Sequence, residues 1–184
     1  MSRAFRVYFR ALELDDYKTS VHWRRDDAMW ESVAGRRYYV SEEYERQWVE
    51  RRVSGIPNSE TFAICLLEND AYIGNAYLNE IDLFNRSCTS GRLIGDPGYR
   101  GKGLGLEITM LLLRHAFMEL GLERVASRQL TTNIASIKSL AKAGYRQEGI
   151  ARKAVMKSGK LVDLNLMACL REDFLPLWEE FSNE

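Results

Sequence analysis

The chain has 184 residues, of which 46% are hydrophobic and 28% are charged, with 26 basic and 26 acidic residues. This length and composition predict a single globular domain over residues 1–184 with a hydrophobic core. A formal net charge of zero argues against general nucleic-acid or membrane-surface binding, because proteins of both classes normally carry a basic excess.

Several absences point to a cytoplasmic protein. Residues 1–6 lack the apolar core of a signal sequence, and no stretch approaches the ~20 apolar residues of a membrane span. The three cysteines are odd in number and widely spaced, which favours reduced thiols over a disulfide framework or a zinc site. We expect no metal.

The first half of the chain predicts strands and two helices. Alternation of apolar and polar residues indicates a strand over 5–11. The next elements are a helix capped by Asp15 and Asp16, a second helix with Ser41 as its N-cap, and a strand pair over 61–67 and 71–81.

The second half alternates strands with helices. It predicts a strand over 88–94, an apolar helix over 104–120 that Gly121 ends, a strand over 124–130, a helix over 134–143 and a closing hairpin with strands over 151–156 and 161–170. Strands and helices in this order indicate an α/β or α+β sheet with helices on both faces.

Residues 94–105 read IGDPGYRGKGLG and stand directly before the apolar helix. Small residues before a helix leave backbone N–H groups accessible at the positive end of the helix dipole, which favours phosphate binding. Arg100 and Lys102 add positive charge. The spacing matches neither a Walker loop nor the dinucleotide fingerprint G-x-G-x-x-G. It fits R-x-x-G-x-G, formed by Arg100, Gly103 and Gly105.

A second pattern follows about thirty residues downstream, where Asn133 and Ser136 precede a short helix and then the residues Lys142, Gly144 and Tyr145. Together, the two patterns resemble the signatures of the GNAT acetyltransferase superfamily, whose members bind acetyl-CoA at the first of them. Further short matches place the resemblance in the branch of ribosomal-protein N-terminal, spermidine and amino-sugar acetyltransferases.

The resemblance implies a GNAT-like mixed, mostly antiparallel twisted sheet flanked by helices. Its fourth and fifth strands, here over 88–94 and 124–130, would splay apart to form the acetyl-CoA cleft. It also implies acetyl-CoA as co-substrate. The residues that would hold it are Leu93, Ile94, Gly95, Arg100, Gly101, Lys102, Gly103, Leu104, Gly105, Asn133 and Ser136.

Acetyl transfer from a thioester to an amine needs the neutral amine, which for a lysine-like group at pH 7 costs about 4.6 kcal/mol. A general base is therefore expected, and Glu80 and Glu148 are the candidates. The family often has a tyrosine as general acid seven residues after the motif asparagine, where this sequence has Leu140. Ser136 and Ser139 are alternative donors toward the sulfur.

The acceptor is less well defined, because variable segments recognise it. In the family, the region around residues 30–40 lines the acceptor site. Trp30 and Tyr38 beside Glu31 would provide an aromatic and acidic wall for a cationic or sugar amine. The sequence does not decide whether the acceptor is a small-molecule amine, such as a polyamine, or a peptide amine, such as a protein N-terminus. Relatives suggest a homodimer.

Two functions are compatible with these observations. The first is an acetyl-CoA-dependent N-acetyltransferase that works by direct attack of the amine within a ternary complex. The second is a non-catalytic acyl-CoA sensor on the same fold, which the missing tyrosine allows. Turnover separates them, because a sensor would bind acetyl-CoA without releasing thiol.

Overall fold

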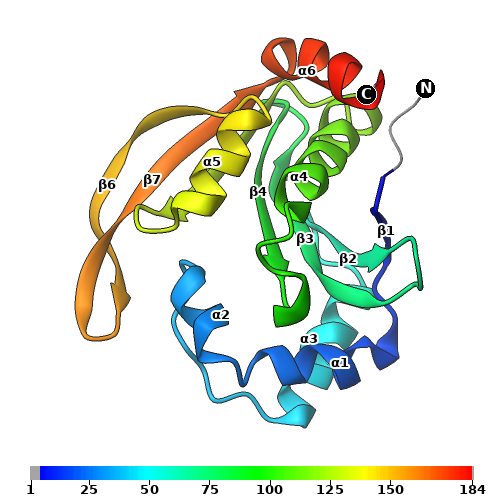
Figure 1. The fold of residues 1–184 in the computed structure, drawn as a ribbon, viewed down its shortest axis with the longest axis vertical. Helices are drawn as coiled ribbons and strands as arrows, with labels where there is room; N and C mark the ends of the chain where they lie inside the picture. Colours follow the sequence, from blue (N-terminus) through cyan, green and yellow to red (C-terminus); the bar gives the residue numbers. More distant parts are fainter. Residues whose placement is uncertain (1–4, 184) are drawn as a thin grey trace.

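Seven strands form one sheet in the order β1-β2-β3-β4-β5-β7-β6 in the computed structural model, which describes residues 5–183 (Figure 1). The strands are β1 (Val7–Ala11), β2 (Glu60–Leu66), β3 (Tyr72–Asp82), β4 (Ser87–Ile94), β5 (Arg124–Leu130), β6 (Arg146–Lys157) and β7 (Lys160–Leu170). The helices are α1 (Tyr17–Trp23), α2 (Asp27–Ser32), α3 (Glu42–Val53), α4 (Leu104–Arg114), α5 (Ile134–Lys142) and α6 (Arg171–Asn183).

The single parallel pair among the described strands is β4 with β5, and it is short. Ser87, Cys88 and Thr89 pair with Arg124, Val125 and Ala126. From Ser90 onward the two strands separate, while β4 keeps its antiparallel partner β3 as far as Ile94 and β5 keeps β7 as far as Leu130. The predicted mixed, mostly antiparallel sheet with a splayed pair of strands is therefore confirmed.

The two faces of β4 contact different helices, because successive strand residues point to opposite sides. Cys88 belongs to the core cluster that includes α4, and the Arg92 guanidinium lies beside Gly105 in α4. On the other face Leu93 packs with Met29 and Trp30 of α2. Helices thus cover both faces of the sheet, as predicted.

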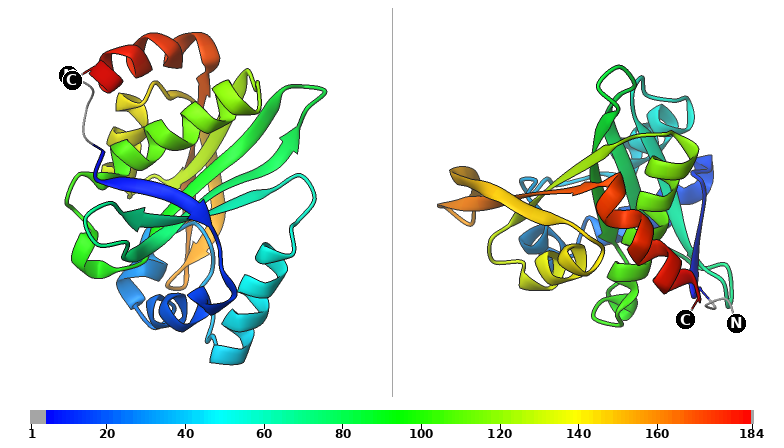
Figure 2. Two further views of the ribbon diagram at one scale, coloured as in Figure 1. Left: turned by 90° about the vertical axis from the view of Figure 1, so that its right-hand side faces the viewer. Right: turned by 90° about the horizontal axis from the view of Figure 1, so that it is seen from above.

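The β6–β7 hairpin extends away from the rest of the sheet (Figure 2). Its tip contacts the segment around α2. The Lys157 Nζ donates to the backbone carbonyls of Trp30 and Gly35, each at 2.6 Å, and Ser158 Oγ donates to Glu31 at 2.8 Å. The hairpin, which lies at the β6 edge of the sheet, therefore holds the segment that follows α1 in place.

Four features of the fold differ from the sequence prediction. Helix α2 lies between the two helices predicted for the first half of the chain, and α6 follows β7; neither was predicted. The helix predicted over 104–120 is α-helical only to Arg114, after which His115–Glu119 form a π-helical turn. Strand β6 begins at Arg146, five residues earlier than expected, with register shifts that bend the β6–β7 hairpin.

Helix starts follow local sequence signals in two of three cases. Ser41 Oγ accepts from the N–H of Tyr44, and Asn133 Oδ1 accepts from the N–H of Ser136, both at 3.1 Å, as the predicted N-caps require. Asp16 precedes α1, but its carboxylate binds Arg10 and the N–H of Glu13 instead of capping that helix.

Residues 1–4, on which the expectation about a signal sequence partly rests, lie outside the described residues. Between residues 5 and 183, no helix is long and apolar enough to cross a membrane. The same residues contain no group of three or more histidine, cysteine, aspartate or glutamate side chains suited to a metal ion.

Candidate active site

A cavity of about 350 Å³ lies where β4 and β5 separate. Residues from β3, β4, β5, α2, α4 and α5 line it, so both faces of the sheet contribute. The lining residues are Arg24, Met29, Trp30, Ser32, Val33, Ala34, Gly35, Tyr77, Ser90, Gly91, Arg92, Leu93, Thr109, Leu112, Ser127, Arg128, Gln129, Leu130, Asn133, Ser136 and Leu140.

The glycine loop lies directly after β4, at the start of α4. Gly101 and Gly103 have φ values of +74° and +76°, a region that other residues rarely adopt, and Gly103 is the N-cap of α4. The first N–H groups of the helix have no intrahelical partner, so the loop presents donors at the positive end of the helix dipole. This geometry suits a phosphate group.

Two cations flank this loop. Lys102 lies over the Tyr99 ring, with its Nζ 4.8 Å from the centroid. Arg6 donates to the carbonyl of Lys102 at 3.1 Å and pairs with the buried Glu107, also at 3.1 Å. A Cβ on Gly103 would lie 3.9 Å from an Arg6 terminal nitrogen, so the guanidinium lies close to the N-terminus of α4.

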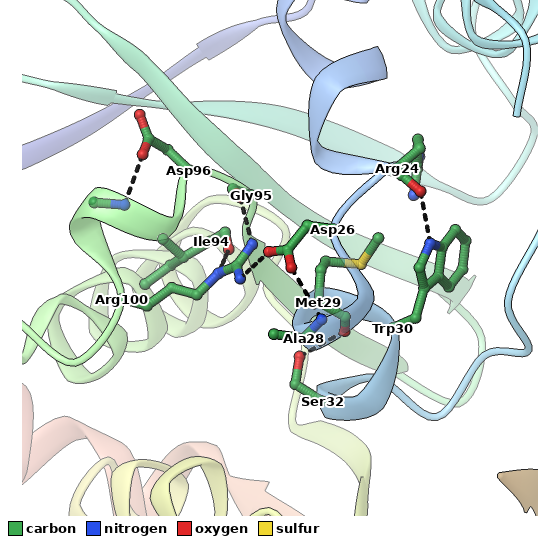
Figure 3. A network of polar contacts seen from close by, with 11 residues as sticks. Arg24, Asp26, Ala28, Met29, Trp30, Ser32, Ile94, Gly95, Asp96 and Arg100 are labelled. Carbon is green, nitrogen blue, oxygen red and sulfur yellow. Dashed lines mark hydrogen bonds and ion pairs between the residues drawn. The ribbon is translucent and has the colours of Figure 1, made fainter. Parts of the chain in front are cut away.

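Arg100, the first residue of R-x-x-G-x-G, points toward the end of β4 and Asp26 (Figure 3). It donates through Nε to the carbonyl of Ile94 at 2.9 Å and through Nη2 to the carbonyl of Gly95, and it pairs with Asp26. Asp26 caps α2 by accepting from the N–H of Ala28, and the hydrogen bond from Arg100 lowers the Asp26 pKa. Arg100 therefore connects the end of β4 to α2.

Arg92 is the charged residue of β4 on the α4 and α5 side of the cavity. Its guanidinium makes no hydrogen bond or ion pair with any residue between 5 and 183. A Cβ on Gly105 would lie 3.4 Å from its Nη2 and 3.3 Å from Ser139 Oγ, which is buried and unpartnered. Burial lowers the pKa of Arg92 to about 10. A cation pressed against the positive end of α4 is unfavourable unless an anion binds there.

The backbone amides of β4 alternate in direction. The N–H of Gly95 donates to the Ile73 carbonyl at 2.8 Å, so by the antiparallel pattern the N–H of Leu93 also points to β3. The amides of Arg92 and Ile94 then point toward the open side, where β5 has separated. Of Leu93, Ile94 and Gly95, the β4 residues that the resemblance assigns to acetyl-CoA, only Ile94 has its amide oriented toward the cleft, together with the amide of Arg92.

Helix α5 forms the second wall of the cleft on this side. Asn133, Ser136 and Leu140 line the cavity, and Leu140 is almost fully buried. Asn133 caps α5 and also donates to the carbonyl of Ser32 at 2.9 Å, which joins α5 to the end of α2. Ser139 lies outside the lining residues, beside Gly105.

The opposite side of the cavity is aromatic and contains a buried ion pair. Arg24 pairs with Glu45 at 3.0 Å, and Glu45 is only 1% exposed. Trp30 donates to the Arg24 carbonyl at 2.8 Å, and the Tyr38 ring lies 5.9 Å from the Trp30 ring. Of the predicted acceptor residues, only Trp30 lines the cavity. Tyr38 is 42% exposed, and Glu31 is an exposed partner of Ser158.

Neither candidate base lines the cavity. Glu80 is an exposed residue with a φ of +53°, in the irregular end of β3 before the β3–β4 turn. Glu148 of β6 faces a separate hollow and pairs with Arg124, which lowers the Glu148 pKa. Among the described residues that line the cavity, none is an aspartate, glutamate or histidine.

The geometry can be compared with known proteins at this point. A family model described as an acetyltransferase (GNAT) domain matches residues 6–146. The chain belongs to the GNAT acetyltransferase family. The probable N-acetyltransferase YjcK of Bacillus subtilis is 30% identical over 94% of this chain and 84% of its own length. An uncharacterized N-acetyltransferase p20 of Bacillus licheniformis is 29% identical over 61% of this chain and 63% of its own.

Solved structures resemble this GNAT protein in fold. Spermidine N-acetyltransferase from Vibrio cholerae, in complex with CoA and spermine, matches with a TM-score of 0.84 at 19% identity, over 92% of this chain and 98% of the other. A GNAT acetyltransferase from Bacillus anthracis matches with a TM-score of 0.79 at 21% identity, over 93% and 98%. The predicted family, fold and enzyme class are therefore confirmed.

The sequence analysis missed four charged residues of this GNAT protein's site: Arg6, Asp26, Arg92 and Arg128. Their positions depend on strands and helices that meet only in the folded chain, since Arg6 and Lys102 are 96 residues apart and Asp26 and Arg100 are 74 residues apart. Arg92 did carry a signal, because it is the only charged residue of the strand predicted over 88–94 and stands two residues before the glycine loop.

Proposed function

We propose that this protein is an acetyl-CoA-dependent N-acetyltransferase that moves acetyl to a primary amine by direct attack in a ternary complex. The observation that carries the proposal is the cavity between the splayed β4 and β5, which residues of α4 and α5 line on one side and residues of α2, including Trp30, line on the other. The glycine loop lies outside the lining, between the end of β4 and the N-terminus of α4. The α4 and α5 side would take the thioester of a cofactor whose phosphates bind at the glycine loop, and the α2 side would take the amine.

The pyrophosphate of acetyl-CoA would bind the N–H groups between Gly101 and Gly105. Arg92, Arg6 and Lys102 bring positive charge to the same place, and the unpaired Arg92 gains its anion when the cofactor binds. The pantetheine arm would follow the gap between β4 and α5, past Asn133 and Ser136. Arg100 takes a positioning role, because its side chain holds the end of β4.

The reaction needs an oxyanion site and a neutral amine. One of the two outward-pointing amides, that of Arg92 or that of Ile94, would donate to the thioester oxygen as the amine nitrogen attacks the carbonyl carbon. The C–S bond then breaks, CoA leaves as thiolate, and the amine proton passes to solvent. A thiol with a pKa near 8.5 leaves acceptably without a general acid, so Leu140 is compatible with turnover.

The cavity lining favours deprotonation without a carboxylate base. No carboxylate among the described lining residues would stabilise a bound ammonium group, and its desolvation in the cleft would lower its pKa. Each unit of that shift supplies about 1.4 kcal/mol toward the neutral amine. Water would take the proton.

The alternative is an acyl-CoA sensor, which would bind acetyl-CoA without releasing thiol. Small residues, among them Ala34, Gly35 and Gly91, line the α2 side of the cavity and leave room for an acceptor, as the enzyme needs.

A thiol-release assay with acetyl-CoA tests the proposal, using spermidine, amino sugars, aminoacyl peptides, amino acids and small amines as acceptors. Calorimetric titration with acetyl-CoA alone is run beside it. We expect binding without acceptor and thiol release only with an accepted amine. Binding without release for every amine would contradict the enzyme in favour of the sensor, and no binding would contradict both.

A further inference from the structure

Three arginines line the cavity, and their partners differ. Arg24 is neutralised by the buried Glu45. Arg92 lies on the α4 side, where the anionic tail of the cofactor would bind. The third, Arg128 of β5, is exposed and makes no hydrogen bond or ion pair through its side chain with any residue between 5 and 183. Its charge has no partner among the described residues, and the proposed cofactor site does not use it.

Arg128 faces the acceptor side of the sheet. Thr89 pairs with Ala126 in the parallel ladder, so Ala126 and Arg128 share a face with Gly91 and Leu93. Leu93 packs against α2 on that face. Ser127 and Gln129 point to the opposite face, where both are buried. The guanidinium therefore belongs to the side from which an acceptor would approach the thioester.

A second hollow, of about 540 Å³, continues from this point between β5 and the β6–β7 hairpin. It shares Ser127 and Arg128 with the cleft, so Arg128 lies where the two spaces meet. Most of its remaining lining is small or apolar: Ala126, Ala151, Ala154, Val155, Leu164, Leu166 and Met167. Its only carboxylate among the described lining residues, Glu148, is neutralised by Arg124.

This distribution of charge is the opposite of what a polyamine needs. A polyamine bound by one amine leaves further ammonium groups that require carboxylates, whereas this path offers a free guanidinium and an apolar wall. An acceptor that brings its own anion would pair with Arg128 and place its apolar part in the hollow.

We propose that the acceptor is an apolar primary amine that carries a carboxylate, as in an amino acid, and that Arg128 binds this carboxylate. The proposal rests on the proposed acetyl transfer and names the substrate class of the same site. The amine would point into the cleft between β4 and β5, and the carboxylate would remain at its edge.

Matched acceptor pairs test this. Acetylation of leucine and of leucinamide is measured with the wild type and with Arg128→Gln, together with spermidine. We expect Arg128→Gln to lower kcat/KM for leucine about tenfold and to leave leucinamide unchanged, because only leucine has the carboxylate. Leucine and leucinamide differ in amine pKa, but this difference affects the wild type and the variant equally. It therefore cancels when the ratio of variant to wild-type kcat/KM is taken for each acceptor.

Arg51→Gln is the control, since Arg51 is an exposed arginine of α3 that does not line the cleft, and the same charge is lost. It should leave both acceptors unchanged. An equal loss for leucine and leucinamide in Arg128→Gln, or a wild type that prefers spermidine to leucine, would overturn the inference while leaving acetyl transfer intact. No thiol release with any acceptor would instead contradict the proposed function.

Discussion

The two walls of the cleft are built in different ways. On the α4 and α5 side, the important features follow from neighbours in sequence: a glycine loop before a helix, and an asparagine that caps the next helix. On the α2 side they depend on contacts between distant segments, such as Arg100 with Asp26 and Lys157 with the carbonyls of Trp30 and Gly35. The backbone of the cofactor side is thus specified locally, whereas the charges of Arg6 and Arg92 and the whole of the acceptor side depend on the complete fold.

The largest effect expected on the cofactor side comes from Gly103→Val. A β-branched residue is strained at the φ of +76° and brings bulk to the phosphate-binding N–H groups. We expect the Kd for acetyl-CoA to rise at least a hundredfold by calorimetry. Gly55→Val is the matched control, because Gly55 has a φ of +87° and open space around its Cα. Unchanged affinity in folded Gly103→Val would refute the site.

Arg92→Met separates cofactor binding from chemistry on the same wall. We expect the Kd for acetyl-CoA to rise roughly tenfold and kcat at saturation to change little. The variant should also melt at a higher temperature, since it removes a desolvated, unpaired cation. A large loss of kcat with unchanged Kd would assign Arg92 to the reacting centre instead.

Asp26→Asn tests whether the two walls are coupled. Asparagine keeps the cap on α2 but removes the charge that pairs with Arg100. We expect the acceptor KM to rise about fivefold, with little change in acetyl-CoA affinity. Steady-state kinetics at saturating acetyl-CoA measures this, and a larger effect on acetyl-CoA than on the acceptor would contradict the coupling.

The same substitution has a defined dependence on pH. Arg100 lowers the Asp26 pKa in the folded protein, so this aspartate contributes stability above its unfolded pKa, near 3.9, and loses it as pH falls through the lower folded value. Urea unfolding should therefore show wild type more stable than Asp26→Asn at pH 7, by less than ~1 kcal/mol, and a smaller difference near pH 3. A difference that grows on acidification would have the wrong sign.

The smallest effect is expected for the two glutamates that the sequence suggested as bases. Glu80→Gln and Glu148→Gln should change kcat less than threefold, because neither residue lines the cavity. Since Arg124 lowers the Glu148 pKa, Glu148 stays ionised across neutral pH and its removal should leave the pH profile of kcat unchanged. A hundredfold loss in either variant would identify the base.

The sequence predicted those parts of the site that depend on backbone geometry. Gly101 and Gly103 adopt positive φ values and Asn133 caps α5, because glycine and asparagine have these properties wherever they occur. The splayed strands came from the family resemblance. Helix α2 was missed because six residues are too few for a periodic pattern, and Arg128 because alternation alone does not say which face will receive a ligand.

The contacts of the β6–β7 hairpin also bear on how the protein is made. Lys157 and Trp30 are separated by 127 residues, and Asn133 and Ser32 by 101. During synthesis from the N-terminus, the segment around α2 therefore emerges long before the residues that hold it in place. Until the hairpin has left the ribosome, the carbonyls of Trp30 and Gly35 therefore lack the Lys157 ammonium group that they bind in the folded protein.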